Sequence, residues 1–152
     1  MDKQMRKPSS SYLYLALGVM QAIHSIEEYL TRLFDWFPIV TGHIRNWIGF
    51  FPILRMEERT FVVLNIVLIV GLLSISPFVF KEKSWALGIA KLVAAVELLN
   101  GLAHLSAAIY VRGYFPGSLN ATGLLVVGFL LTRSFFVRRD GKGERVRGLY
   151  TF

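Results

Sequence analysis

The segment AIHSIEEYL, residues 22–30, places one histidine and two glutamates inside an otherwise apolar stretch. His24 and Glu28 are four positions apart, so on a helix they share one face, and Gln21 joins that face three positions before His24. An imidazole beside a carboxylate can hold a metal ion or transfer a proton. Ionisable side chains at membrane depth are costly and mark functional sites. The spacing therefore indicates a site on this segment.

A second polar group lies further along the chain, in the apolar segment 85–110. Glu97, Asn100 and His104 step by three and four positions, so they line one stripe of a helix. Lipid offers polar groups no hydrogen bonds, so two such stripes at one depth are best satisfied by facing each other. We therefore expect both stripes to line one cavity in the outer half of the membrane.

This convergence leaves two kinds of chemistry open. In the first, imidazoles and carboxylates hold one or two divalent metal ions, zinc or iron. The expected metal ligands are His24, Glu28, His104 and Glu97. In the second, no metal is bound, and a carboxyl group in an apolar site exchanges protons with a substrate, as an isomerase or cyclase requires. The candidate catalytic residues are Glu28, Glu97, His24 and Glu27, and the candidate substrate-binding residues are Asn65, Asn100, Tyr114 and Gln21.

Four apolar segments are long enough to position these residues as membrane-spanning helices, which take about 20 residues each. They cover residues 11–30, 60–80, 85–110 and 118–137. The segment at 60–80, TFVVLNIVLIVGLLSISPFVF, carries no charge at all. Each segment must be helical, because lipid leaves the backbone groups no other partner. We predict an all-α fold in which residues 1–152 form a single membrane domain, a four-helix transmembrane bundle.

The segment between the first two spans, residues 31–59, is rich in aromatic residues and is interrupted by Pro38 and Pro52. It is too broken to span a bilayer, which predicts an outer interfacial or re-entrant cap with one or two short helices. His43 lies in this cap, and whether the cap brings it into the site is left open. The charged, glycine-containing stretch 138–152 is predicted to be a frayed basic tail.

Charge and composition favour a membrane as the partner. Hydrophobic residues make up 54% of the chain, and the basic residues behind its net charge of +7 flank the apolar runs. This pattern argues against a nucleic-acid partner. The sequence contains no cysteine, which excludes disulfides and thiolate metal ligands. With four spans both termini share one side, and that side collects most of the Lys and Arg residues, which predicts a multi-pass cell-membrane protein with both termini in the cytoplasm.

Three short motifs resemble those of the HXXEE-motif family of small membrane proteins: HSIEE at 24–28, NGLAH at 100–104 and YFPG at 114–117. They follow the family's order, so the resemblance covers roughly residues 20–120. The family has no established activity. The resemblance therefore implies that a set of residues acts together, but it indicates no reaction. The residues that it implies are His24, Glu27, Glu28, Asn100, His104, Tyr114, Pro116 and Gly117. At the level of one motif, the His-three-Glu pair is also similar to the sterol isomerases of the emopamil-binding-protein type.

We therefore expect a membrane-embedded enzyme that acts on a lipophilic small molecule, which enters sideways from the lipid bilayer. A small transporter is an alternative from another class, because proton relays also use buried Glu and His. A third alternative is a lipid-binding or structural subunit in which the polar stripes hold helices together. A single-chain bundle and a homodimer are both compatible with four spans.

Overall fold

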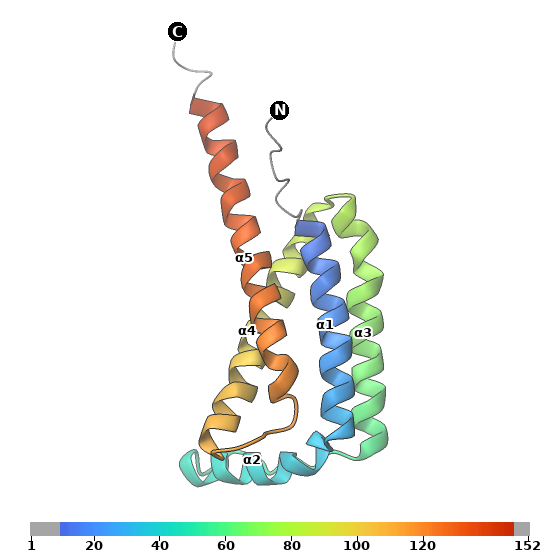
Figure 1. Ribbon diagram of the computed structural model, residues 1–152, viewed down its shortest axis with the longest axis vertical. Coiled ribbons are helices and arrows are strands. Elements are labelled where there is room, and N and C mark those ends of the chain that lie inside the picture. Colours follow the sequence, from blue (N-terminus) through green and yellow to red (C-terminus); the bar gives the residue numbers. More distant parts are fainter. Residues whose placement is uncertain (1–9, 148–152) are drawn as a thin grey trace.

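The computed structural model describes the backbone of residues 10–147 and the side chains of residues 10–136. Within that range the chain forms five helices and no strand, which confirms the all-α prediction. The helices are α1 (Ser10–Leu30), α2 (Leu33–Trp47), α3 (Glu58–Phe80), α4 (Ser84–Tyr110) and α5 (Ser118–Arg147). Four of them run lengthwise, and the short α2 lies across one end of that group (Figure 1).

The long helices pack unequally. Helix α1 contacts both α3 and α5, and α4 packs mainly on α5, whereas α3 and α4 touch each other little. The beginning of α1, the turn between α3 and α4 and the end of α5 lie towards one end of the molecule (Figure 1). Helix α2 and the loop between α4 and α5 lie at the opposite end.

Among the described residues, three helices are long and apolar enough to cross a membrane: Glu58–Phe80, Ser84–Tyr110 and Ser118–Phe136. Three of the predicted spans are therefore helices with the length and apolar character that crossing a membrane requires. Helix α1 is not among them, because it carries the polar residues His24, Glu27 and Glu28 within its 21 residues. The structure instead places these polar side chains on its buried side, together with Tyr14 and Leu17.

Two segments differ in detail from the sequence prediction. The stretch 31–59 contains one helix, the 15-residue α2 with Pro38 inside it, and residues 48–57 form no regular element. Helix α5 continues to Arg147, through most of the stretch 138–152 that the sequence predicted to be a frayed basic tail. Residues 148–152 of that prediction lie outside the described residues.

Small residues lie where α4 and α5 pack together, with Gly101 of α4 beside Ala121 of α5. Ala86, Ala90 and Ala94 recur every four positions on α4 and are fully buried, and Ala121 of α5 is buried as well. Small side chains let helix backbones approach closely, which suits packing in lipid. Gly101 continues this stripe towards the end of α4 at which α2 lies.

The Gly101→Ala variant is expected to destabilise the fold by about 1–3 kcal/mol. A Cβ at Gly101 would lie 3.0 Å from the backbone oxygen of Ala121 and 2.8 Å from Cγ of Leu125, and the backbone oxygen cannot move without shifting α5. Gly88→Ala on the same helix is the control, because its Cβ meets no atom within 4 Å. That variant is expected to gain about 0.5–1 kcal/mol from the helix preference of alanine. Thermal unfolding in detergent measures both, and equal melting temperatures would contradict the packing argument.

Candidate metal centre and its cavity

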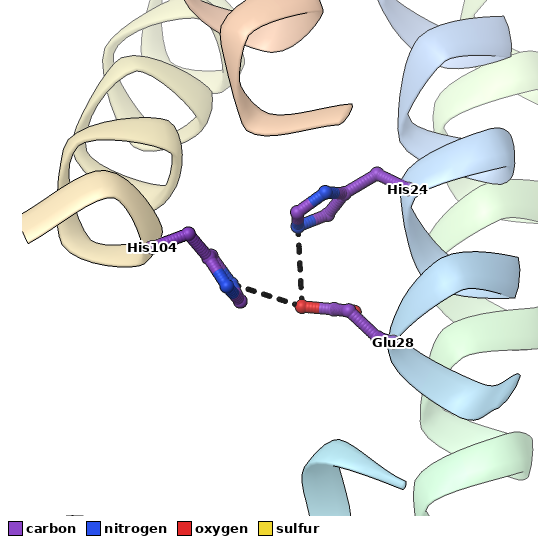
Figure 2. A group of neighbouring side chains, drawn as sticks. All are labelled: His24, Glu28 and His104. Atoms are coloured by element: carbon purple, nitrogen blue, oxygen red, sulfur yellow. Dashed lines mark ion pairs between the residues drawn. The ribbon is translucent and has the colours of Figure 1, made fainter. Parts of the chain in front are cut away.

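Three buried side chains from two helices meet at one point (Figure 2). Helix α1 supplies His24 and Glu28, which share a face because they are one helical turn apart, and α4 supplies His104. Nε2 of His24 lies 3.2 Å from Oε1 of Glu28, and Nε2 of His104 lies 3.0 Å from the same oxygen. The two imidazole rings meet edge to face with their centroids 4.7 Å apart.

A backbone contact determines which nitrogen of His104 carries hydrogen. Nδ1 lies 2.6 Å from the carbonyl oxygen of Pro116, and a carbonyl can only accept a hydrogen bond. Nδ1 therefore carries the hydrogen, and in the neutral ring Nε2 presents its lone pair to Oε1 of Glu28. Two acceptors 3.0 Å apart require a proton or a cation between them. Metal-bound histidines commonly donate their other ring N–H to a carbonyl in this way.

The spacing of the three side chains suits a small divalent ion. One ligand atom from each of His24, Glu28 and His104 lies within 4.8 Å of the other two. Tetrahedral zinc with bonds of 2.0–2.1 Å holds its ligand atoms about 3.3 Å apart, close to the two nitrogen–oxygen separations here. Nδ1 of His24 has no hydrogen-bond partner among the described residues, and Nε2 has only its contact with Glu28 at 3.2 Å. Three protein ligands leave a fourth position open, the arrangement of catalytic zinc sites.

The YFPG turn at 114–117 supports both histidines. Pro116 supplies the carbonyl that orients His104, and the Phe115 ring packs 5.7 Å from the His104 ring, centroid to centroid. Gly117 adopts a positive φ of 84°, and a Cβ there would lie 2.6 Å from Nδ1 of His104 and 2.9 Å from Cε1 of His24. The sequence singled out these residues only as a family motif and Tyr114 as a candidate substrate-binding residue, because a backbone carbonyl leaves no trace in the residue types.

Glu27 does not face the metal-ligand group. Its Oε1 accepts hydrogen bonds from the Tyr114 hydroxyl at 2.7 Å and the Leu119 N–H at 3.0 Å, and its Oε2 accepts one from the Asn120 N–H at 2.8 Å. The two amides belong to the first turn of α5, where N–H groups lack partners within the helix. The structure therefore assigns Glu27, a predicted catalytic residue, to fixing α5 and the YFPG turn to α1.

Tyr114, which the sequence predicted to bind substrate, takes part in the same contact. Burial and then the hydrogen bond to the Glu27 carboxylate raise the pKa of its phenol, so the hydroxyl remains protonated and donates at neutral pH. The structure thus uses Tyr114 to hold the turn that carries Pro116 and Gly117.

The Glu27→Gln variant is expected to lose about 1–3 kcal/mol of stability. A neutral amide replaces the carboxylate at the N-terminus of α5, and its NH₂ group faces hydrogen-bond donors where an oxygen accepted from them. Glu58→Gln is the matched control, since Glu58 also accepts a tyrosine hydroxyl, that of Tyr29 at 3.0 Å, but at an exposed position. The control is expected to change stability by less than about 0.5 kcal/mol. Thermal unfolding of the two variants side by side measures the difference. A Glu27→Gln protein with the wild-type melting temperature would show that the Glu27 carboxylate does not fix α5 to α1.

A cavity of about 760 Å³ opens beside the three ligands, between α1, α2, α3 and α4. Glu28 and His104 lie in its wall, so an ion held by these residues would lie beside the cavity. Most of the lining is apolar, with Trp36 and Phe37 of α2 at one end. Four other predicted site residues also line the cavity: Gln21, Asn65, Glu97 and Asn100.

Two sequence predictions on the edge of this site need refinement. Glu97, predicted as a ligand, is buried in the cavity wall but lies outside the three-residue ligand group, and its Oε2 is 3.5 Å from Nδ2 of Asn100. His43 packs against Tyr110 with ring centroids 6.0 Å apart and does not line the cavity. Ser25, on the buried side of α1, was not predicted; its hydroxyl accepts a hydrogen bond from Gln21 and donates one to Asn65.

The fold and the site define an all-helical protein with three candidate membrane spans and a buried His–Glu–His group beside an apolar cavity. The chain belongs to the HXXEE family, described as proteins of unknown function with an HXXEE motif, whose model matches residues 15–132. Comparison with curated proteins and with solved structures gave no match. The likeness to sterol isomerases therefore rests on the motif alone.

Proposed function

We propose that the protein is a metal-dependent enzyme embedded in a membrane, where it acts on a lipophilic small molecule. The observation that carries the proposal is the convergence of His24, Glu28 and His104 on one point, with Glu28 and His104 in the wall of a largely apolar cavity. A zinc or iron ion with an open position polarises a substrate oxygen or activates a bound water. Glu97, buried in the same wall and outside the ligand group, is the proton acceptor or donor that such chemistry needs.

The membrane assignment extends to α1 as a fourth span. Its 21 residues measure about 31 Å at 1.5 Å per residue, enough for the hydrocarbon core. Its polar side chains are buried against α3, α4 and α5 rather than turned outwards, which is how spans accommodate ionisable residues. Substrate enters sideways between α3 and α4, which touch little and both line the cavity.

Helix α2 serves as the interfacial cap of this arrangement. Phe34 is buried and packs on Phe61 with ring centroids 5.7 Å apart, and Trp36 packs on Phe115 at 5.2 Å. Trp47 and Phe50 at the other end of the segment are 90% and 89% exposed. Exposed aromatic rings of this kind favour the membrane–water interface.

Metal analysis tests the proposal. Protein purified without a metal-affinity tag is expected to contain zinc or iron close to one ion per chain, and the His104→Ala variant close to none. Elemental analysis by mass spectrometry measures both, with His43→Ala as a control that removes a histidine outside the cavity. Wild-type protein without metal, and without affinity for added Zn²⁺ or Fe²⁺, would reject this proposal in favour of metal-free proton transfer by Glu97 and Glu28.

Both termini are expected to lie in the cytoplasm. Helices α1, α3, α4 and α5 then cross in alternate directions, and the turn at 81–83 with its two lysines lies on the same side as the termini. A reporter that is active only in the periplasm, fused after residue 152 in a bacterial host, should be silent. A cytoplasm-only reporter at the same position should be active, and the opposite pattern would overturn the orientation.

A further inference from the structure

A chain of hydrogen bonds between α1 and α3 has a fixed direction. Nδ2 of Asn65 donates to the backbone carbonyl of Phe61 at 3.0 Å, which determines how the Asn65 amide is turned. Its Oδ1 therefore faces Ser25, whose hydroxyl donates to it at 2.6 Å. Because that hydroxyl has only one hydrogen, the contact of Ser25 with Gln21 at 3.2 Å must be donated by Nε2 of Gln21.

This chain leaves the oxygen of Gln21 as an acceptor without a donor. Oε1 has no hydrogen-bond partner among the described residues, and the Gln21 side chain is only 3% exposed. The residue lines the 760 Å³ cavity. Buried polar atoms are almost always paired, and an unpaired one in a native structure calls for a missing partner. Within a membrane, bulk water cannot fill that role.

The other residues that line the cavity indicate which chemical groups that partner carries. Glu97 and Asn100 of α4 line the same cavity, and the other lining residues are mostly apolar. A ligand that fits needs an apolar body and a single donor group. A hydroxyl group meets this need at a lower desolvation cost than a charged ammonium group.

We propose that the cavity binds a membrane-soluble alcohol, whose hydroxyl donates a hydrogen bond to Oε1 of Gln21. The inference rests on the proposed function for its lipophilic ligand, and it adds the hydroxyl group and the residue that recognises it. Ser25 and Asn65 act as positioning residues, because they hold the Gln21 amide with its oxygen free.

A pair of probes that differ by one hydrogen-bond donor tests the proposal. The first is a long-chain primary alcohol brominated along its chain, and the second is its methyl ether, which can accept but not donate. Bromine quenches tryptophan fluorescence on contact, and Trp36 lines the cavity. The full-length protein carries Trp47→Phe and Trp85→Phe, which leave Trp36 as its single tryptophan, and sits in nanodiscs of saturated phosphatidylcholine. The alcohol is expected to quench Trp36 at about tenfold lower mole fraction than the ether.

Variants in the same background locate the effect. Gln21→Leu keeps a side chain of similar size without the acceptor. In this variant both probes should quench Trp36 equally. Ser25→Ala frees the Gln21 amide to turn and should reduce the preference for the alcohol. Ser76→Ala is the control, since Ser76 Oγ is also buried without a partner on α3 but does not line the cavity. It should keep the full preference.

The outcomes separate this inference from the proposed function. Equal quenching of the parent protein by alcohol and ether overturns the alcohol site, as does an undiminished preference in Gln21→Leu. Parent protein stripped of metal with a chelator should still prefer the alcohol, because the hydrogen bonds that orient Gln21 involve none of the three metal-ligand residues. A parent protein that prefers the alcohol but binds no metal would leave the alcohol site standing and reject the metal-dependent reaction.

Discussion

The Gly117→Ala variant is expected to bind Co²⁺, a spectroscopic substitute for zinc, about 100-fold more weakly than the wild type. Two independent constraints act at this position. The backbone has a φ of 84°, a left-handed conformation that residues other than glycine rarely adopt. A Cβ would also lie 2.6 Å from Nδ1 of His104 and 2.9 Å from Cε1 of His24, so both rings must move.

Titration with Co²⁺, followed by visible absorption, measures the affinity of each variant. Gly113→Ala in the same loop is the control, because its Cβ would meet only the Val111 carbonyl oxygen at 3.9 Å. That variant should bind Co²⁺ as the wild type does. Circular dichroism shows whether the helices of Gly117→Ala remain folded. A folded Gly117→Ala protein with wild-type Co²⁺ affinity would show that the turn does not hold the histidines in place.

Helical periodicity explains why much of the arrangement was predictable. The 3.6-residue repeat placed His24 with Glu28, and Glu97 with Asn100 and His104, on single faces of their helices, and the structure brings both faces to one cavity. Long apolar runs predicted four spans, and three of them are helices long and apolar enough to cross a membrane. The three motifs predicted the family, which the match over residues 15–132 confirms.

Contacts made by the backbone could not be predicted from residue types. Glu27 and Glu28 are neighbours of identical chemistry, yet about 100° of helical rotation turns one towards α5 and the other towards the histidines. Pro116 acts through a carbonyl that every residue possesses. The extension of α5 to Arg147 was missed as well, because a charged stretch with glycines lacks the apolar stripe on which helix prediction depends.

The two buried glutamates of the cavity are expected to respond differently to the same substitution. Glu28→Gln replaces the carboxylate that both histidines approach, and a neutral amide is a poor zinc ligand. Removal of an outer-shell partner lowers metal affinity by roughly 10–100-fold, and the metal affinity of Glu28→Gln should fall by more than that. Glu97→Gln alters a side chain outside the ligand group and should retain metal within about tenfold of wild type.

Zinc-dependent melting separates these roles without knowledge of the reaction. At a free Zn²⁺ concentration of 100 times Kd, the wild type gains about 2.7 kcal/mol of stability from binding, and Glu97→Gln should gain nearly as much. Glu28→Gln should gain almost none. In zinc-free buffer Glu97→Gln should melt close to the wild type or above it, because it removes a buried carboxylate that is costly to desolvate. Equal zinc-dependent gains for Glu28→Gln and the wild type would exclude Glu28 as a ligand. A lost gain in Glu97→Gln would return that residue to the coordination sphere, as its spacing on α4 first indicated.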